Sequence, residues 1–99
     1  MTVKVKPMNE AELLTAIKQS LNISGAHFDD TLNLFIDEVK GYLMSAGVDA
    51  AVLGSTLAVG CIARGVADLW NYGNGDTQLS EYFYQRAAQL RCIEVSKDE

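Results

Sequence analysis

The sequence predicts a single all-α domain of four helices, at about residues 9–21, 30–46, 55–72 and 78–91. Three observations support this fold class. Apolar residues in each segment recur at the i, i+3, i+4 spacing of one helix face. Turn residues, glycine prominent among them, separate the segments. The hydrophobic fraction of 48% is enough for a modest core in a chain of 99 residues.

The two chain ends are predicted to lie outside this helical domain. Residues 1–8 alternate apolar and basic side chains up to Pro7, which is compatible with a short edge strand or a flexible arm. We favour a flexible N-terminal arm, because a lone strand would have no partner in a helical protein. Residues 92–99 form a flexible, charged C-terminal tail.

The first two helices have recognisable starts and stops. Asn9 is a good N-cap, and acidic residues follow it in the first turn. The second helix begins near Asp29 or Asp30, and Phe28 is placed to pack back on it as a staple. Gly47 is placed to stop the second helix. The apolar faces comprise Leu13, Leu14, Ile17 and Leu21 in the first helix, and Leu32, Phe35, Ile36, Val39, Leu43 and Ala46 in the second.

The third helix is the predicted centre of the domain, because it is rich in alanine and glycine and needs neighbours. Gly60 and Gly65 each lower its intrinsic stability by about 0.5–1 kcal/mol relative to alanine, so packing must offset this loss. The turn at residues 73–77 and a cap at Thr77 or Ser80 lead into the fourth helix. The apolar faces comprise Val59, Ile62, Ala63, Val66, Leu69 and Trp70 in the third helix, and Leu79, Tyr82, Phe83, Leu90 and Ile93 in the fourth.

Charge and composition argue against several classes of protein. The net charge of −5, with thirteen acidic residues against eight basic ones, disfavours a dedicated nucleic-acid-binding domain. The two cysteines are far apart and remote from His27, so no metal site is expected. We find neither a signal peptide nor an apolar stretch of the ~20 residues that a membrane-spanning helix requires. We therefore expect a soluble protein without a membrane or metal partner.

No constellation of residues indicates catalysis. The glycine-rich segment at residues 73–76 follows a helix and lacks the lysine of a phosphate-binding loop. Asp29 and Asp30 are adjacent, so they do not face a common point, and they already suit a helix start. His27 has no nucleophile in a recognisable context, and the apolar neighbours of Cys61 raise the pKa of its thiol. We expect that the protein is not an enzyme and uses no cofactor.

Residues suited to protein contacts are the better functional candidates. Arg64 and Asp68 lie four residues apart on one helix face, either as a surface ion pair or as an intersubunit contact. Most aromatic residues around the turn serve the core, and one or two tyrosines left outside would suit an interface. The candidate interaction residues are Arg64, Asp68, Tyr72, Tyr84, Arg86 and Arg91.

The order of these segments resembles a known family. Two amphipathic helices precede an alanine- and glycine-rich helix that ends in LWNYG at residues 69–73. An acidic turn and a closing QLR at residues 89–91 follow. This succession, from Glu10 to Arg91, resembles the small phage head–tail connector, or adaptor, proteins, including the QLRG-type DNA-packaging family that is also found in prophages. Cys92 stands where the family pattern has glycine, which leaves the end of the fourth helix open.

The resemblance implies a structural protein of the virion, located at the head–tail junction and present in the host cytoplasm before assembly. Such subunits form a ring of about twelve copies through head-to-tail contacts. The ring docks beneath the portal protein, extends the DNA channel, and offers a platform for a tail-completion or stopper protein. DNA passes through without sequence-specific binding, in keeping with the acidic charge. By analogy, the fourth helix and the tail contact the portal, and the second and third helices supply the core and ring contacts.

Two other classes of protein remain for comparison. The alternative function is that of a small cytoplasmic helical regulator, or adaptor, which binds one protein partner as a monomer or dimer. The position of the gene separates these two functions, because a connector gene should lie between capsid and tail genes. A helix-turn-helix DNA-binding protein ranks last, because the third and fourth helices carry only Arg64, Arg86 and Arg91 as bases.

Overall fold

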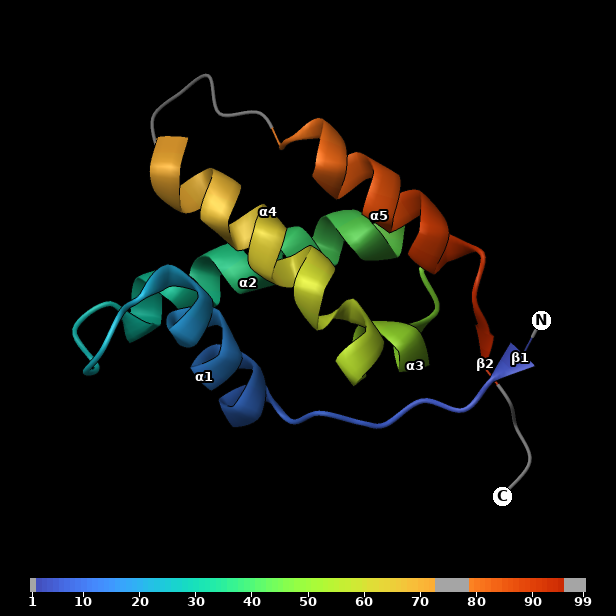
Figure 1. Ribbon diagram of the computed structural model, residues 1–99, viewed down its shortest axis with the longest axis horizontal. Helices are drawn as coiled ribbons and strands as arrows, with labels where there is room; N and C mark the ends of the chain where they lie inside the picture. The colour runs from blue at the N-terminus through green and yellow to red at the C-terminus, as the bar shows by residue number, and fades with distance from the viewer. Residues whose placement is uncertain (1, 73–78, 96–99) are drawn as a thin grey trace.

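The computed structural model confirms the all-α fold class (Figure 1). It describes residues 2–72 and 79–95, so the predicted turn at residues 73–77, including a cap at Thr77, lies outside the described residues. Four long helices lie at the predicted places, and a short helix and a 3-10 turn connect two of them. In chain order the elements are β1 (Thr2–Val3), α1 (Glu10–Leu21), α2 (Asp29–Ser45), α3 (Ala50–Leu53), η1 (Thr56–Ala58), α4 (Val59–Tyr72), α5 (Glu81–Arg91) and β2 (Glu94–Val95).

Local hydrogen bonds explain where α1 and α2 begin and end. Asn9 and Glu12 form a reciprocal capping box, in which Asn9 Oδ1 accepts from the Glu12 N–H at 2.7 Å. Gly47 has a φ of 100° and ends α2, as predicted. Its N–H donates to the Met44 carbonyl, while the next N–H donates to the Leu43 carbonyl, both at 3.1 Å. Together these two bonds form a Schellman motif, which fixes the direction in which the chain leaves α2.

The third and fourth long helices begin later than the sequence predicts. The predicted start at Ser55 is wrong, because Ser55 Oγ accepts from the Leu57 N–H at 3.2 Å and caps the 3-10 turn instead. The α-helix therefore starts at Val59. Ser80 is the N-cap of α5, one of the two caps predicted, and its Oγ accepts from the Phe83 N–H at 3.2 Å.

The core lies around α4, which crosses the front of the molecule in Figure 1 and packs against α1, α2 and α5. Each predicted apolar face contributes buried residues. Tyr82 is the exception, because its side chain is 59% exposed, and its assignment to the core is wrong. Ala87 instead occupies the inward position one turn after Phe83. The largest fully buried side chains are Phe83, Ile17, Leu32, Leu43, Ile62, Leu90, Val39, Val52 and Val66.

Gly65 sets how closely α4 approaches its neighbours. A Cβ atom at this position would lie 2.9 Å from Phe83 Cε1 of α5 and 2.9 Å from Val39 Cγ2 of α2. Real Cβ atoms essentially never come this close to another atom, so any larger residue would push the helices apart. Gly60 lies five residues earlier and differs, because a Cβ atom there would meet no atom within 4 Å.

The prediction that the N-terminal segment is an arm without a partner is wrong. Strand β1 pairs in parallel with β2, so part of the predicted C-terminal tail supplies the missing partner. The Lys6 carbonyl accepts from the Thr56 N–H, and the Met8 N–H donates to the Gly54 carbonyl, both at 2.9 Å. These partners are remote in sequence, and for that reason local patterns did not reveal them. In Figure 1 the segment before α1 extends across the molecule to reach β2.

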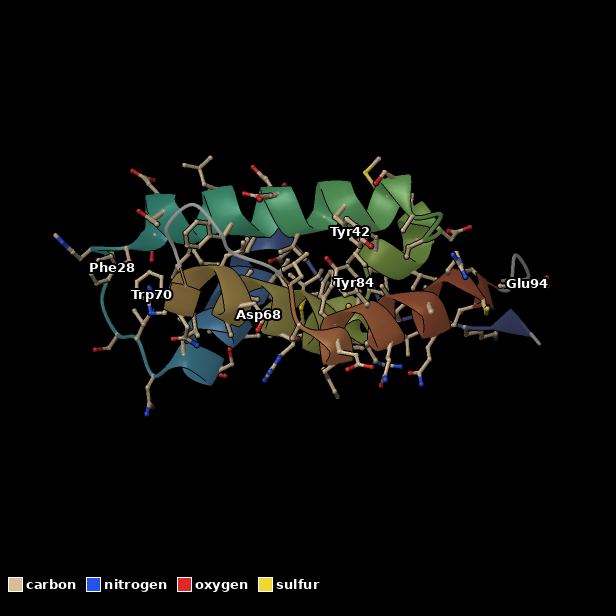
Figure 2. The ribbon with its side chains drawn as sticks, turned by 90° about the horizontal axis from the view of Figure 1, so that it is seen from above. Phe28, Tyr42, Asp68, Trp70, Tyr84 and Glu94 are labelled. Carbon is tan, nitrogen blue, oxygen red and sulfur yellow. The ribbon has the colours of Figure 1, made fainter. Side chains whose placement is uncertain are left out.

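The chain forms a flat body measuring 41 × 28 × 17 Å along its principal axes. Seen from above in Figure 2, α2 runs along one side, while α4 and α5 lie on the other. Of the helices in the described part of the chain, none is both long and apolar enough to span a membrane. A body this thin leaves large surfaces on both of its broad sides.

The two glycines of α4 make a matched pair for testing the packing. Gly65→Ala should lower the free energy of unfolding by about 1–3 kcal/mol, because the added methyl group overpacks the contact with Val39 and Phe83. Gly60→Ala should raise it by about 0.5–1 kcal/mol, since alanine favours the helix and the space is open. Urea unfolding measures both. A Gly65→Ala protein at least as stable as wild type would contradict the packing described here.

Candidate interaction surface

Arg64, Asp68 and Ser80 form a network that joins α4 to the start of α5. The Asp68 carboxylate is buried, with 4% of the residue exposed, and its Oδ2 accepts from the Ser80 N–H at 2.8 Å. Arg64 Nε donates to Ser80 Oγ at 3.2 Å and lies 3.5 Å from Asp68 Oδ1. The predicted ion pair between Arg64 and Asp68 is present, but the prediction that it lies on the surface is wrong for Asp68. Burial removes this carboxylate from the surface and makes it an anchor for α5.

Arg64 also borders a shallow depression on the side of α4 that faces away from α2. Its side chain is 50% exposed, and its guanidinium carbon lies 5.7 Å from the centre of the Tyr82 ring. The depression has a volume of about 340 Å³ and crosses α4 between α1 and α5. Its lining consists of Ser20, Gly60, Ala63, Arg64, Ala67 and Tyr82.

Tyr84 lies elsewhere, in an aromatic cluster between α2 and α5. Its side chain is exposed, and its ring centre lies 5.7 Å from those of Tyr42 and Phe83. Figure 2 shows Tyr42 and Tyr84 pointing toward one another from their two helices. Of the aromatic residues around the turn, Tyr82 and Tyr84 are exposed, in agreement with the expectation that one or two tyrosines stay outside the core. Tyr42 of α2 is exposed as well.

Arg86 and Arg91 belong to neither group. Arg86 is half-buried, and its Nη1 donates to Gln89 Oε1 at 2.7 Å. Arg91 is exposed near the end of α5 and packs its aliphatic carbons beside Gly47. Tyr72 ends α4, and its side chain lies outside the described part of the structure. The five candidates whose side chains the structure describes are therefore spread over α4 and α5 and do not form a single site.

Sequence reasoning missed the most exposed apolar residues, which lie on α2. Leu34 and Met44 are 69% and 61% exposed. The buried residues of α2 follow one row along the helix, and Leu34 lies on the opposite side from that row. The position of Leu34 outside the predicted apolar face was the signal of a contact surface in the sequence, because an apolar residue outside the core face needs another partner.

The chemistry available among the described residues is limited. Cys61 is fully buried, and loss of solvent raises the pKa of its thiol to about 11, against a smaller opposing effect of the Arg86 charge. The thiol is therefore neutral at neutral pH, in agreement with the sequence-based expectation. Within residues 2–72 and 79–95, no three His, Cys, Asp or Glu side chains are grouped as a metal ion would require.

Comparisons with protein-family models, with curated proteins and with solved structures found no match to this chain. The surfaces described above are therefore the basis for inferring its function.

The network around Asp68 leads to a local prediction. Asp68→Ala should lower the free energy of unfolding by about 1–3 kcal/mol, because the Ser80 N–H loses its acceptor. Hydrogen exchange should become faster at the first turn of α5, including the Phe83 amide. Asp37→Ala, which removes an exposed carboxylate from the middle of α2, should change stability by no more than about 0.5 kcal/mol. Unchanged exchange in α5 would show that Asp68 does not anchor the helix.

Proposed function

We propose that this chain is a structural subunit of a phage or prophage head–tail connector. In this proposal the subunits assemble as a ring beneath the portal protein, extend the DNA channel, and join head to tail. The resemblance of residues 10–91 to the connector proteins motivates the proposal. The observation that supports it most is the placement of exposed apolar side chains on both broad sides of a thin body.

The two sides carry different groups. Leu34 and Met44 lie on the outer side of α2, and each has more than half of its surface exposed. Tyr82 lies beside the depression on the other side of α4, with Arg64 over its ring. A ring subunit needs two different contact surfaces, because each copy binds one neighbour with one surface and the next neighbour with another. A single-partner adaptor needs only one.

Charge is also compatible with a DNA channel. The whole chain has a net charge of −5, with thirteen acidic residues against eight basic ones. An acidic wall repels the phosphate backbone, so DNA would pass through without being retained. In this proposal DNA is a passenger that the protein does not read, and the protein has no catalytic role.

The portal and a tail-completion or stopper protein are the proposed partners within the virion. By analogy, α5 and the residues after it contact the portal. The pairing of β1 with β2 holds this end of the chain close to its start. A shift of the C-terminal residues at the portal contact would therefore also move the N-terminal segment.

The alternative is a cytoplasmic regulator or adaptor that binds one protein as a monomer or dimer. The aromatic cluster of Tyr42 and Tyr84 favours it, because two adjacent exposed tyrosines on neighbouring helices suit a single docking patch. This alternative gives no role to Leu34, Met44 or the depression beside Arg64. The connector function therefore accounts for more of the surface.

Binding to a portal tests the proposed function. We expect the gene for this chain to lie between capsid and tail genes, and the purified protein to co-sediment with capsids that carry the neighbouring portal protein. Capsids that lack the portal are the matched control and should not retain the protein. Equal retention by both kinds of capsid, or by neither, would overturn the connector function.

A further inference from the structure

The outer side of α2 presents a regular row of residues with no partner in the described chain. Leu34, Asp37, Gly41 and Met44 follow the i, i+3, i+7, i+10 spacing of a helix-pairing seam. All four residues are exposed, and a Cβ atom at Gly41 would meet no atom within 4 Å. We call these four residues the α2 row. Leu34 and Met44, at the two ends of the row, lie about 15 Å apart along the helix. Asp37 and Gly41 lie between them.

The depression on the opposite side of the molecule has complementary properties. Its floor is formed by Gly60, Ala63 and Ala67 of α4, which have no side chains long enough to keep a second helix away. Arg64 and Tyr82 stand on the α5 side, and Ser20 stands on the α1 side. The lining contains one base, the half-exposed Arg64, which also pairs with the buried Asp68, and no exposed acid. The α2 row contains one exposed acid and no base.

We propose that the α2 row of one copy docks in the depression of a second copy, with Leu34 and Met44 against the small floor and Asp37 facing Arg64. Three features of the chain support this choice of occupant. The charges are opposite, the protruding side chains meet a floor of small residues, and Tyr82 adds an exposed aromatic contact. This inference rests on the self-assembly in the proposed function and assigns its contact surfaces.

The positions of the two surfaces determine what the contact builds. Gly65 faces Val39 of α2, whereas the α4 residues that line the depression lie on the opposite face of that helix, so a copy that offers its α2 row to a neighbour still has its depression free. Such a contact is heterologous and adds further copies, closing into a ring where the rotation between neighbours permits. It does not by itself close at two copies.

Two variants that each block one surface test this inference by sedimentation velocity. Leu34→Asp places a charge in the α2 row and leaves the depression intact. Gly60→Gln fills the depression at an open position and leaves the α2 row intact. Each variant alone should lose association by about tenfold or more and sediment as a monomer. An equal mixture should form a one-to-one pair, because each variant supplies the surface that the other lacks.

Controls separate this result from loss of folding or a change in net charge. Ala11→Asp adds the same charge at an exposed position on α1 and should associate like wild type. The urea midpoints of Leu34→Asp and Gly60→Gln should show that both proteins remain folded. Asp37→Arg lies outside the network of Asp68 and Ser80 and should weaken association, because it places a second positive charge opposite Arg64.

Three outcomes would overturn the inference: a blocked variant that associates like wild type, a mixture that stays monomeric, or a wild-type protein that never self-associates. Binding to portal-bearing capsids is measured separately. If the wild-type protein binds these capsids and the two blocked variants still self-associate, only the proposed contact surfaces are refuted. The expected mixture result without capsid binding would keep this contact and refute the connector function.

Discussion

The packing of α4 against α2 and α5 depends on the absence of a side chain at Gly65. Val39 and Phe83 occupy the space where a Cβ atom would lie, at separations of 2.9 Å. This contact joins three helices at one point, so it fixes the distance between the two layers of the flat body. The same contact therefore sets the distance between the outer side of α2 and the depression on the far side of α4. The small size of Gly65 thus allows the close packing of the core that lies between these two surfaces.

A second constraint holds the C-terminal part of the chain in place. The buried Asp68 carboxylate accepts a hydrogen bond from the N–H of Ser80, the N-cap of α5, and Arg64 Nε donates to Ser80 Oγ. Beyond α5, the pairing of β2 with β1 connects the two ends of the described chain. The same Arg64 that supports this network borders the depression. In the proposed contact between copies, Arg64 therefore serves both stability and recognition.

Periodicity was enough to predict the four long helices, because an apolar face repeats along each helix whatever its neighbours are. Tertiary contacts were harder to predict. The partner of β1 lies at the opposite end of the chain, and Asp68 is buried only because α5 folds back over it. Tyr82 shows the limit most clearly, since an apolar residue on the inward face of an amphipathic helix is first assigned to the core, and its side chain is instead exposed. Of the predicted interaction residues, Arg64 and Tyr84 lie on the exposed surfaces described here, whereas Asp68 is buried.

Self-assembly is the central claim of the proposed function, and the mass of the purified wild-type protein in solution tests it most directly. Light scattering across a concentration series gives this mass without any assumption about shape. The proposal predicts a species of about ten or more subunits whose fraction grows with concentration. A stable dimer at every concentration would contradict it, because a contact between opposite sides of the molecule does not close at two copies.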